Sequence, residues 1–153
     1  MKYICPLLAV KNMEASKRFY QDVLGLSVVN DFGANVTLTG GIALQTLDSW
    51  KSLIGTDRVT LQSHGGELYF EENDLDTFCR RLTALSVPLV HPLITHRWGQ
   101  RAVRFYDPDG HIIEVGEGMD AVARRFAEDG LSPEDAAKRM DAPLSFVLEC
   151  LKK

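Results

Sequence analysis

Apolar and polar positions first alternate and then recur at helical spacing along this chain. Residues 2–10 alternate as in a β-strand, and a helix is predicted after Asn12, whose side chain suits an N-cap, up to Gly25, which suits a helix end. The apolar stripe of this helix is Met13, Phe19, Tyr20, Val23 and Leu24. Three short strands are predicted next, over residues 26–30, 35–38 and 41–46. The first segment therefore has the order β-α-β-β-β.

The same order returns after a connector, residues 47–65, in which residues 49–54 are predicted to form a short helix. A strand over residues 66–72 precedes a helix that Asp74 caps and Pro88 ends. Its apolar stripe is Leu75, Phe78, Leu82 and Leu85, and three strands follow over 89–96, 100–106 and 112–115. Two βαβββ units in succession indicate a duplication within one fold.

The pattern becomes helical after Gly118. Residues 119–130 form one amphipathic segment, Ser132 and Pro133 begin a second that runs to Met140, and residues 143–151 form a third. We expect one domain over residues 1–118, with modules at about 1–46 and 66–117, and a helical appendix over 119–153 that packs on the domain or stabilises a dimer.

The segment from Arg101 to Glu117 is predicted to be a β-hairpin. Its turn is Asp107-Pro-Asp-Gly110, in which proline presets φ and glycine accepts a positive φ. Glu114 is a carboxylate inside an otherwise apolar strand, so it needs a partner, a metal ion or water. A three-residue turn would place Arg104 opposite Glu114 on the same face.

The composition is that of an ordinary globular domain, with 45% hydrophobic and 25% charged residues and a net charge of −4. The charge gives no basic surface for nucleic acid, and no apolar run is long enough to span a bilayer. We expect a cytoplasmic protein in which Cys5, Cys79 and Cys150 are reduced.

Two segments resemble the glyoxalase/bleomycin-resistance/extradiol-dioxygenase superfamily, also called vicinal oxygen chelate. They are Ala9 to Leu26 and Phe105 to Val115, and the resemblance covers about residues 2–117. It implies an α+β fold in which two βαβββ modules form a cup-shaped, mixed, eight-stranded sheet; here a C-terminal helical extension would follow. It also implies a homodimer, and it leaves function open because the superfamily holds isomerases, epimerases, dioxygenases, thiol transferases and drug-binding proteins.

Metalloenzymes of this superfamily carry a ligand on the first and last strand of each module. The resemblance assigns these positions to Cys5, Gln45, Glu67 and Glu114, of which only Glu114 is the residue usual there. Independently, the two-residue strand period places these four side chains on one face, opposite Leu8, Leu44, Leu68 and Ile113. We therefore expect them to line the cup.

This donor set favours a divalent metal less than the usual imidazoles and carboxylates do, and Arg104 would repel a cation. A metal site at Cys5, Gln45, Glu67 and Glu114 is possible but not favoured. The alternative is a metal-free pocket in which Arg104 pairs with Glu114, and Glu67 pairs with Arg101 or Arg97 or acts as an acid/base group.

Other side chains are candidates for contacting an organic ligand, although each also suits an ordinary structural role. They are Tyr69, Trp98, Trp50, Gln100 and Arg101, besides Arg104, Gln45 and Cys5. No histidine is placed by the sequence to activate Cys5, so a buried, inert thiol is expected there.

Three functions fit the sequence. The first is a lyase or isomerase that acts on a small carbonyl compound, with Glu114 or Glu67 as the general base. The second is a non-catalytic, metal-free protein that binds a small organic molecule or drug. The third is an interaction module that acts through the helical appendix.

Overall fold

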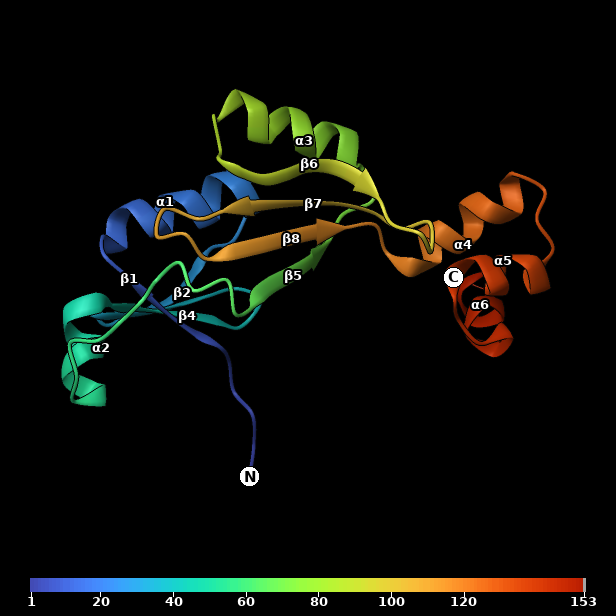
Figure 1. The fold of residues 1–153 in the computed structure, drawn as a ribbon. Helices are drawn as coiled ribbons and strands as arrows, with labels where there is room; N and C mark the ends of the chain where they lie inside the picture. The colour runs from blue at the N-terminus through green and yellow to red at the C-terminus, as the bar shows by residue number, and fades with distance from the viewer. Residues whose placement is uncertain (153) are drawn as a thin grey trace. The chain divides into compact units, whose positions relative to one another are not determined.

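The structure, a computed structural model, describes residues 1–152 in two compact units (Figure 1). The first unit contains residues 1–66 together with the turn 106–111. The second contains residues 67–105 and the chain from Ile112 onward. Each unit holds one four-stranded sheet, and both sheets mix parallel and antiparallel pairs.

The first unit is a βαβββ module followed by a short helix. Its elements are β1 (Leu7–Val10), α1 (Met13–Leu24), β2 (Val28–Asp31), β3 (Asn35–Leu38), β4 (Ile42–Thr46) and α2 (Leu47–Ile54). The strand order is β1-β4-β3-β2, with β1 parallel to β4 and the other neighbours antiparallel. The predicted order of elements is confirmed in this half.

Helix α1 begins and ends where its capping residues predict. The Asn12 side chain accepts a hydrogen bond from the backbone N of Ala15 at 3.0 Å, and Gly25 ends the helix with φ 69°. Tyr20 and Val23, from the predicted stripe, are buried. The helix is thus fixed at both ends by local residues and on one face by the core.

The first strand is shorter than predicted, because it begins at Leu7 and not at Lys2. Tyr3 and Ile4 are 78% and 70% exposed, and Cys5 precedes the strand. Pairing with β4 reaches only as far as the hydrogen bond from Ala43 N to the Pro6 carbonyl. Alternation in residues 2–6 was therefore misleading, since a strand also needs a partner to satisfy its backbone groups.

The second unit repeats the module. Its elements are β5 (Glu67–Glu71), α3 (Leu75–Ala84), β6 (Leu89–Thr95), β7 (Arg101–Tyr106) and β8 (Ile112–Gly116), in the strand order β5-β8-β7-β6. Asp74 caps α3 by accepting from Thr77 N at 3.0 Å. Phe78 of α3 packs against Phe105 of β7, with ring centroids 5.8 Å apart. The two predicted βαβββ modules are confirmed, as two four-stranded sheets.

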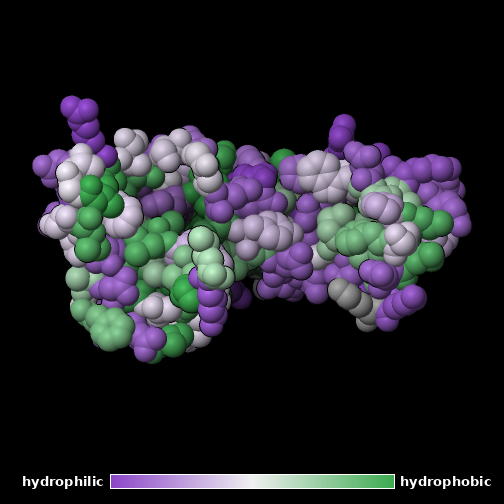
Figure 2. Space-filling view, turned by 90° about the horizontal axis from the view of Figure 1, so that it is seen from below, coloured by the Kyte–Doolittle hydropathy of each residue, from purple (hydrophilic) through white to green (hydrophobic). Residues whose placement is uncertain are grey.

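Three helices complete the second unit: α4 (Met119–Glu128), α5 (Pro133–Met140) and α6 (Leu144–Cys150). They share a core of their own, which consists of Val122, Ala123, Phe126, Ala136, Ala137, Met140, Val147 and Cys150. Apolar side chains also reach the surface of α6, where Leu144, Phe146 and Leu148 are 38%, 40% and 42% exposed. In Figure 2, hydrophobic residues, drawn in green, lie among hydrophilic ones, drawn in purple, over this end of the chain.

Arg125 joins these helices to the turn before β7. Its guanidinium donates to the Gly99 carbonyl at 2.7 Å and to the Glu117 carboxylate at 2.9 Å. Gly99 has φ 92°, and a Cβ atom there would lie 2.2 Å from the Phe126 ring. The turn is therefore shaped to fit α4.

In residues 1–152, no helix is long and apolar enough to cross a membrane. Within that described part of the chain, Cys5, Cys79 and Cys150 form no disulfide.

Candidate functional site

Four side chains, one from each strand, form a row on one face of the second sheet. They are Glu67 of β5, Glu114 of β8, Arg104 of β7 and His91 of β6. Arg104 is the register partner of His91, and Glu114 is that of Tyr69, two residues after Glu67. The opposite face of the same strands carries buried Phe105 and Ile113.

Arg104 is the centre of this row. Its Nε donates to Glu67 Oε2 at 2.8 Å, and its terminal nitrogens contact Glu67 Oε1 at 3.3 Å and form an ion pair with Glu114. The predicted pairing of Arg104 with Glu114 is confirmed. We call Glu67, Glu114, Arg104 and His91 the Arg104 cluster.

For Glu67, the sequence left open a pair with Arg101 or Arg97 or an acid/base role, and the predicted pair was wrong. Arg101 instead contacts Asp76 at 2.7 Å, and Arg97 contacts Asp141 at 3.2 Å. The reason is the strand order: β8, which carries Glu114, lies between β5 with Glu67 and β7 with Arg104, so one guanidinium reaches both carboxylates.

The Arg104 cluster runs from a buried end to an exposed one. The side chains of Glu114, Arg104 and Glu67 are 7%, 25% and 35% exposed. A carboxylate as buried as Glu114 is stable only with such a partner. Glu67 and Glu114 share one guanidinium, so the formal charges of these two acids and Arg104 sum to −1. Glu67 is the more exposed of the two carboxylates.

His91 is a member that the sequence did not reveal. Its Nε2 lies 3.3 Å from an Arg104 terminal nitrogen. The β6–β7 pairing contains register shifts on both sides of His91, so counting back from the turn does not place it. His96, further along β6, has its pKa lowered by burial and by the charges of Arg104 and His91.

Three other predicted ligand contacts, Tyr69, Gln100 and Trp98, adjoin one another in the second unit. Gln100 is 6% exposed; its amide nitrogen donates to Tyr69 Oη at 3.0 Å and to the Glu117 carbonyl at 2.8 Å. Its amide oxygen accepts from Trp98 Nε1 at 3.1 Å. The amide of Gln100 is thus used inside the protein, whereas Tyr69 stays 48% exposed.

Gln45 and Cys5 lie in the first unit. Gln45 is 5% exposed, accepts from Asn35 Nδ2 at 2.8 Å and donates to Ser49 Oγ at 2.6 Å. Cys5 is partly buried ahead of β1, and Trp50 is partly buried on α2. Both ends of the Gln45 amide are therefore occupied, and they fasten β4 to β3 and α2.

The donors at the four superfamily positions do not fit a metal ion. In the second unit, a cation would have to displace Arg104 from both carboxylates. In the first unit, the Gln45 oxygen already accepts from Asn35. Over residues 1–152, no group of three or more His, Cys, Asp or Glu side chains is placed to hold a metal ion.

A second buried polar network lies in the first unit, around Asp107. This carboxylate is fully buried and accepts from Tyr20 Oη at 3.0 Å and from His111 Nδ1 at 2.8 Å. It also accepts from the backbone N of Asp109 and of His111, both at 2.9 Å. Burial would raise the pKa of Asp107, but the hydrogen bonds and charge of His111 outweigh it and hold the pKa below its usual value.

This network gives the turn residues a structural role. Burial and the nearby Asp107 charge raise the pKa of Tyr20 well above its usual value, so its hydroxyl stays a donor. The sequence placed His111 in the turn but did not show that it pairs with Asp107. The available signal in the sequence for this pair was the position of Asp107, an acid at the end of a strand, four residues before His111.

The glyoxalase-like domain family model matches residues 3–120. The chain belongs to the glyoxalase-like family, within the vicinal oxygen chelate superfamily. The match covers both modules and ends at the beginning of α4. A search of the curated proteins finds no match to this glyoxalase-like chain.

Solved structures agree with this family. A protein of unknown function from Agrobacterium tumefaciens strain C58 is 41% identical, with a TM-score of 0.70 over 77% of this chain and 94% of that one. A lactoylglutathione lyase from Agrobacterium tumefaciens is 27% identical, with a TM-score of 0.60 over 78% and 96%. The fosfomycin resistance protein FosX from Mesorhizobium loti, at 18% identity and a TM-score of 0.58 over 76% and 92%, shares the fold.

Proposed function

We propose that this glyoxalase-like protein binds a small polar organic molecule at the Arg104 cluster, without a metal ion and without transforming it. The observation that carries the proposal is that one guanidinium bonds two carboxylates, Glu67 and Glu114, at positions that the resemblance assigns to metal ligands. Arg104 pairs with both acids and would take the role that a cation has in those enzymes.

The cluster also indicates the kind of ligand. Its excess carboxylate charge favours a ligand that carries hydrogen-bond donors or a positive charge. Tyr69, two residues after Glu67 on the same face of β5, offers a half-exposed aromatic ring beside that charge. Such a combination suits an organic amine or polyol with an apolar part.

Thermal unfolding tests this proposal. The EDTA-treated protein is screened against amines, polyols and planar cationic drugs. A ligand raises the unfolding free energy by RT ln(1 + [L]/Kd), so one present at about 100 times its Kd adds about 2.7 kcal/mol. We expect the shift to survive EDTA, to shrink in Glu67→Gln, and to persist in Glu128→Gln on α4. A shift that disappears with EDTA and returns with a divalent ion would contradict the proposal.

A second candidate is a lyase or isomerase that moves a proton next to a carbonyl group, with Glu67 or Glu114 as the base. It is supported by the partial exposure of Glu67, which leaves its carboxylate within reach of a ligand. The 27% identical lactoylglutathione lyase gives further support.

Solvent-deuterium exchange distinguishes the two candidates. Small α-hydroxy carbonyl compounds and their thiol adducts are incubated with the protein in D₂O, and deuterium at the carbon next to the carbonyl is measured by NMR. An enzyme would incorporate deuterium and would lose at least about a hundredfold in rate in Glu67→Gln or Glu114→Gln. Binding without any incorporation in the wild-type protein would eliminate this candidate.

We also propose that the protein forms a homodimer. Support comes from the edge strand β2 and the turn after it, where Val28, Val29 and Phe32 are 45%, 56% and 76% exposed. Light scattering after size exclusion should give about twice the monomer mass, and a Val29→Lys variant should give a monomer. A monomeric wild-type protein at micromolar concentration would refute this.

A further inference from the structure

We infer that a hollow at the end of α5 binds a small organic anion with a planar group. The hollow, of about 360 Å³, is lined by Arg97, Trp98, Lys138, Arg139 and Asp141. Two elements far apart in the sequence supply these residues: the turn after β6 and the last turn of α5 with its cap. This site lies apart from the Arg104 cluster and does not depend on the function proposed above.

The charge of the hollow is opposite to that of the chain. Three of its five residues are basic and one is acidic, whereas the whole chain has a net charge of −4. A local excess of guanidinium and ammonium groups attracts carboxylates and phosphates. General surface charge therefore does not account for this hollow.

The cations are available to a ligand. Arg97 pairs with Asp141 at 3.2 Å, but the two side chains are 82% and 76% exposed, so the pair is weak in water. Lys138 contacts Asp135 at 3.2 Å, also with both side chains exposed. Arg139 is exposed as well. An incoming anion would replace weak, solvated contacts.

Trp98 gives the hollow a fixed aromatic wall. Its Nε1 donates to Gln100 at 3.1 Å, and its ring stacks on His96 with centroids 4.3 Å apart and planes 10° apart. Arg125 holds the next residue of the turn through the Gly99 carbonyl. Because the ring is already oriented, stacking of a planar ligand on it costs the protein little conformational entropy.

Lys138 and Arg139 have another role, since basic side chains in a last turn complement the negative end of a helix dipole. That role explains their place on α5. It does not explain why Arg97 and Trp98, from a different element, border the same hollow.

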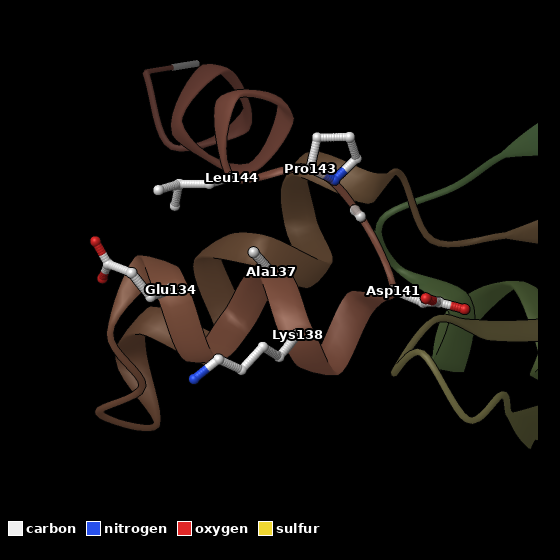
Figure 3. Close-up of a pocket in the computed structure, with 7 residues that line it drawn as sticks. Glu134, Ala137, Lys138, Asp141, Pro143 and Leu144 are labelled. Atoms are coloured by element: carbon white, nitrogen blue, oxygen red, sulfur yellow. The ribbon is translucent and has the colours of Figure 1, made fainter.

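A neighbouring hollow helps to define the ligand. Figure 3 shows it between α5 and the beginning of α6, where Ala137, Pro143 and Leu144 supply apolar walls. Lys138 and Asp141 line both hollows. It contains Glu134 and lacks an arginine. The preference for an anion therefore belongs to the Arg97–Trp98 side.

Fluorescence of Trp98 tests the inference directly. The chain has two tryptophans, so Trp50→Phe leaves Trp98 as the reporter. This variant is titrated with phenyl phosphate, benzoate, inorganic phosphate and phenol. We expect a saturable change with phenyl phosphate or benzoate at a Kd near or below about 1 mM, and weaker binding of phosphate alone and of phenol. The phosphate and carboxylate probes show which anion the site prefers.

Two variants localise the effect. Arg139→Gln should weaken binding of the preferred probe about tenfold, as loss of a charge-assisted hydrogen bond does. Arg80→Gln, on α3 and outside the hollow, should leave the Kd unchanged. The indole N–H signals of the wild-type protein in NMR serve as a second reporter if Trp50→Phe does not fold.

Three results would overturn the inference. They are no saturable change with either aryl anion up to about 10 mM, equal weakening by Arg139→Gln and Arg80→Gln, or phenol binding as tightly as phenyl phosphate. The last would show an apolar site with no role for the cations.

Discussion

Arg104 forms an ion pair with Glu114, a side chain that is only 7% exposed, while it also binds the more exposed Glu67. The pair joins the central strands β7 and β8 of the second sheet. Its two members are not equivalent, because Arg104 has a second acidic partner and Glu114 depends on Arg104. Loss of Arg104 therefore differs in its effect from loss of the Glu114 charge.

Arg104→Gln should destabilise the protein more than Glu114→Gln does. Without the guanidinium, Glu114 is a buried carboxylate with no cation, which costs about 3 kcal/mol or more of unfolding free energy. Without the Glu114 charge, Arg104 remains bound to Glu67, so the loss should be about 1–2 kcal/mol. Urea denaturation at pH 7 measures both.

The control for these variants is Arg124→Gln, because Arg124 pairs with Asp120 on the surface of α4, with side chains 39% and 28% exposed. Its loss should change the unfolding free energy by less than about 1 kcal/mol. Equal losses in Arg104→Gln and Arg124→Gln would show that the burial of Glu114 is unimportant.

Removing Arg104 should also create affinity for a divalent cation. The two carboxylates that it holds would then face each other without a positive charge, and oxygen ligands bind hard divalent ions. Isothermal titration with Mn²⁺ or Mg²⁺ should detect binding to Arg104→Gln at least about tenfold tighter than to the wild-type protein. The double variant Arg104→Gln/Glu114→Gln should lose this gain. Unchanged affinity in Arg104→Gln would mean that the carboxylates separate when the guanidinium is absent.

Asp107 should make the stability depend on acid pH. Its pKa is lower in the folded state than in the unfolded chain, so its stabilisation is fully present above the unfolded value of about 4. It is lost as the pH falls through the folded value. The difference in stability between wild type and Asp107→Asn should therefore be largest near pH 7 and shrink below about pH 4. Thermal unfolding across that pH range checks the sign of the pH dependence. A stability difference that grows in acid would contradict the lowered pKa of Asp107.

Tyr20→Phe tests the same network without changing its charge. The substitution removes a buried hydrogen bond of 3.0 Å to Asp107, and we expect a loss of about 1–3 kcal/mol at neutral pH. If Tyr20 acts through Asp107, the same substitution should cost less in an Asp107→Asn background, and a double-mutant cycle measures this coupling. An equal cost in both backgrounds would show that the two residues act independently.

Gly99→Ala should loosen the three C-terminal helices. A Cβ atom at this position would lie 2.2 Å from the Phe126 ring, in addition to the strain of φ 92°. Gly33→Ala is the matched control, because its φ is 75° and no atom lies within 4 Å of the added Cβ. We expect about 1 kcal/mol for Gly33→Ala and clearly more for Gly99→Ala. Hydrogen exchange should show the extra loss in α4–α6; equal costs would mean that Phe126 moves aside freely.

The order of elements could be predicted because the signals are local. Asn12, Asp74 and Ser132 cap their helices through their side chains, and Gly25 ends α1 with a positive φ, as these residue types predict. The predicted pair of Arg104 and Glu114 also follows from short-range geometry, since a tight turn fixes the register of a hairpin. The error at Lys2–Pro6 arose where a local alternation had no partner strand.

The sequence by itself determined two βαβββ modules, the three helices that follow them, and a carboxylate beside an arginine in the hairpin from Arg101 to Glu117. Only the tertiary structure decided that Arg104 also pairs with Glu67, that His91 contacts Arg104, and that Asp107 accepts a hydrogen bond from Tyr20. Capping and side-chain period act over a few residues, so the sequence displays them. Contacts across a sheet depend on strand order and on register shifts, which are set by the packing of the whole unit.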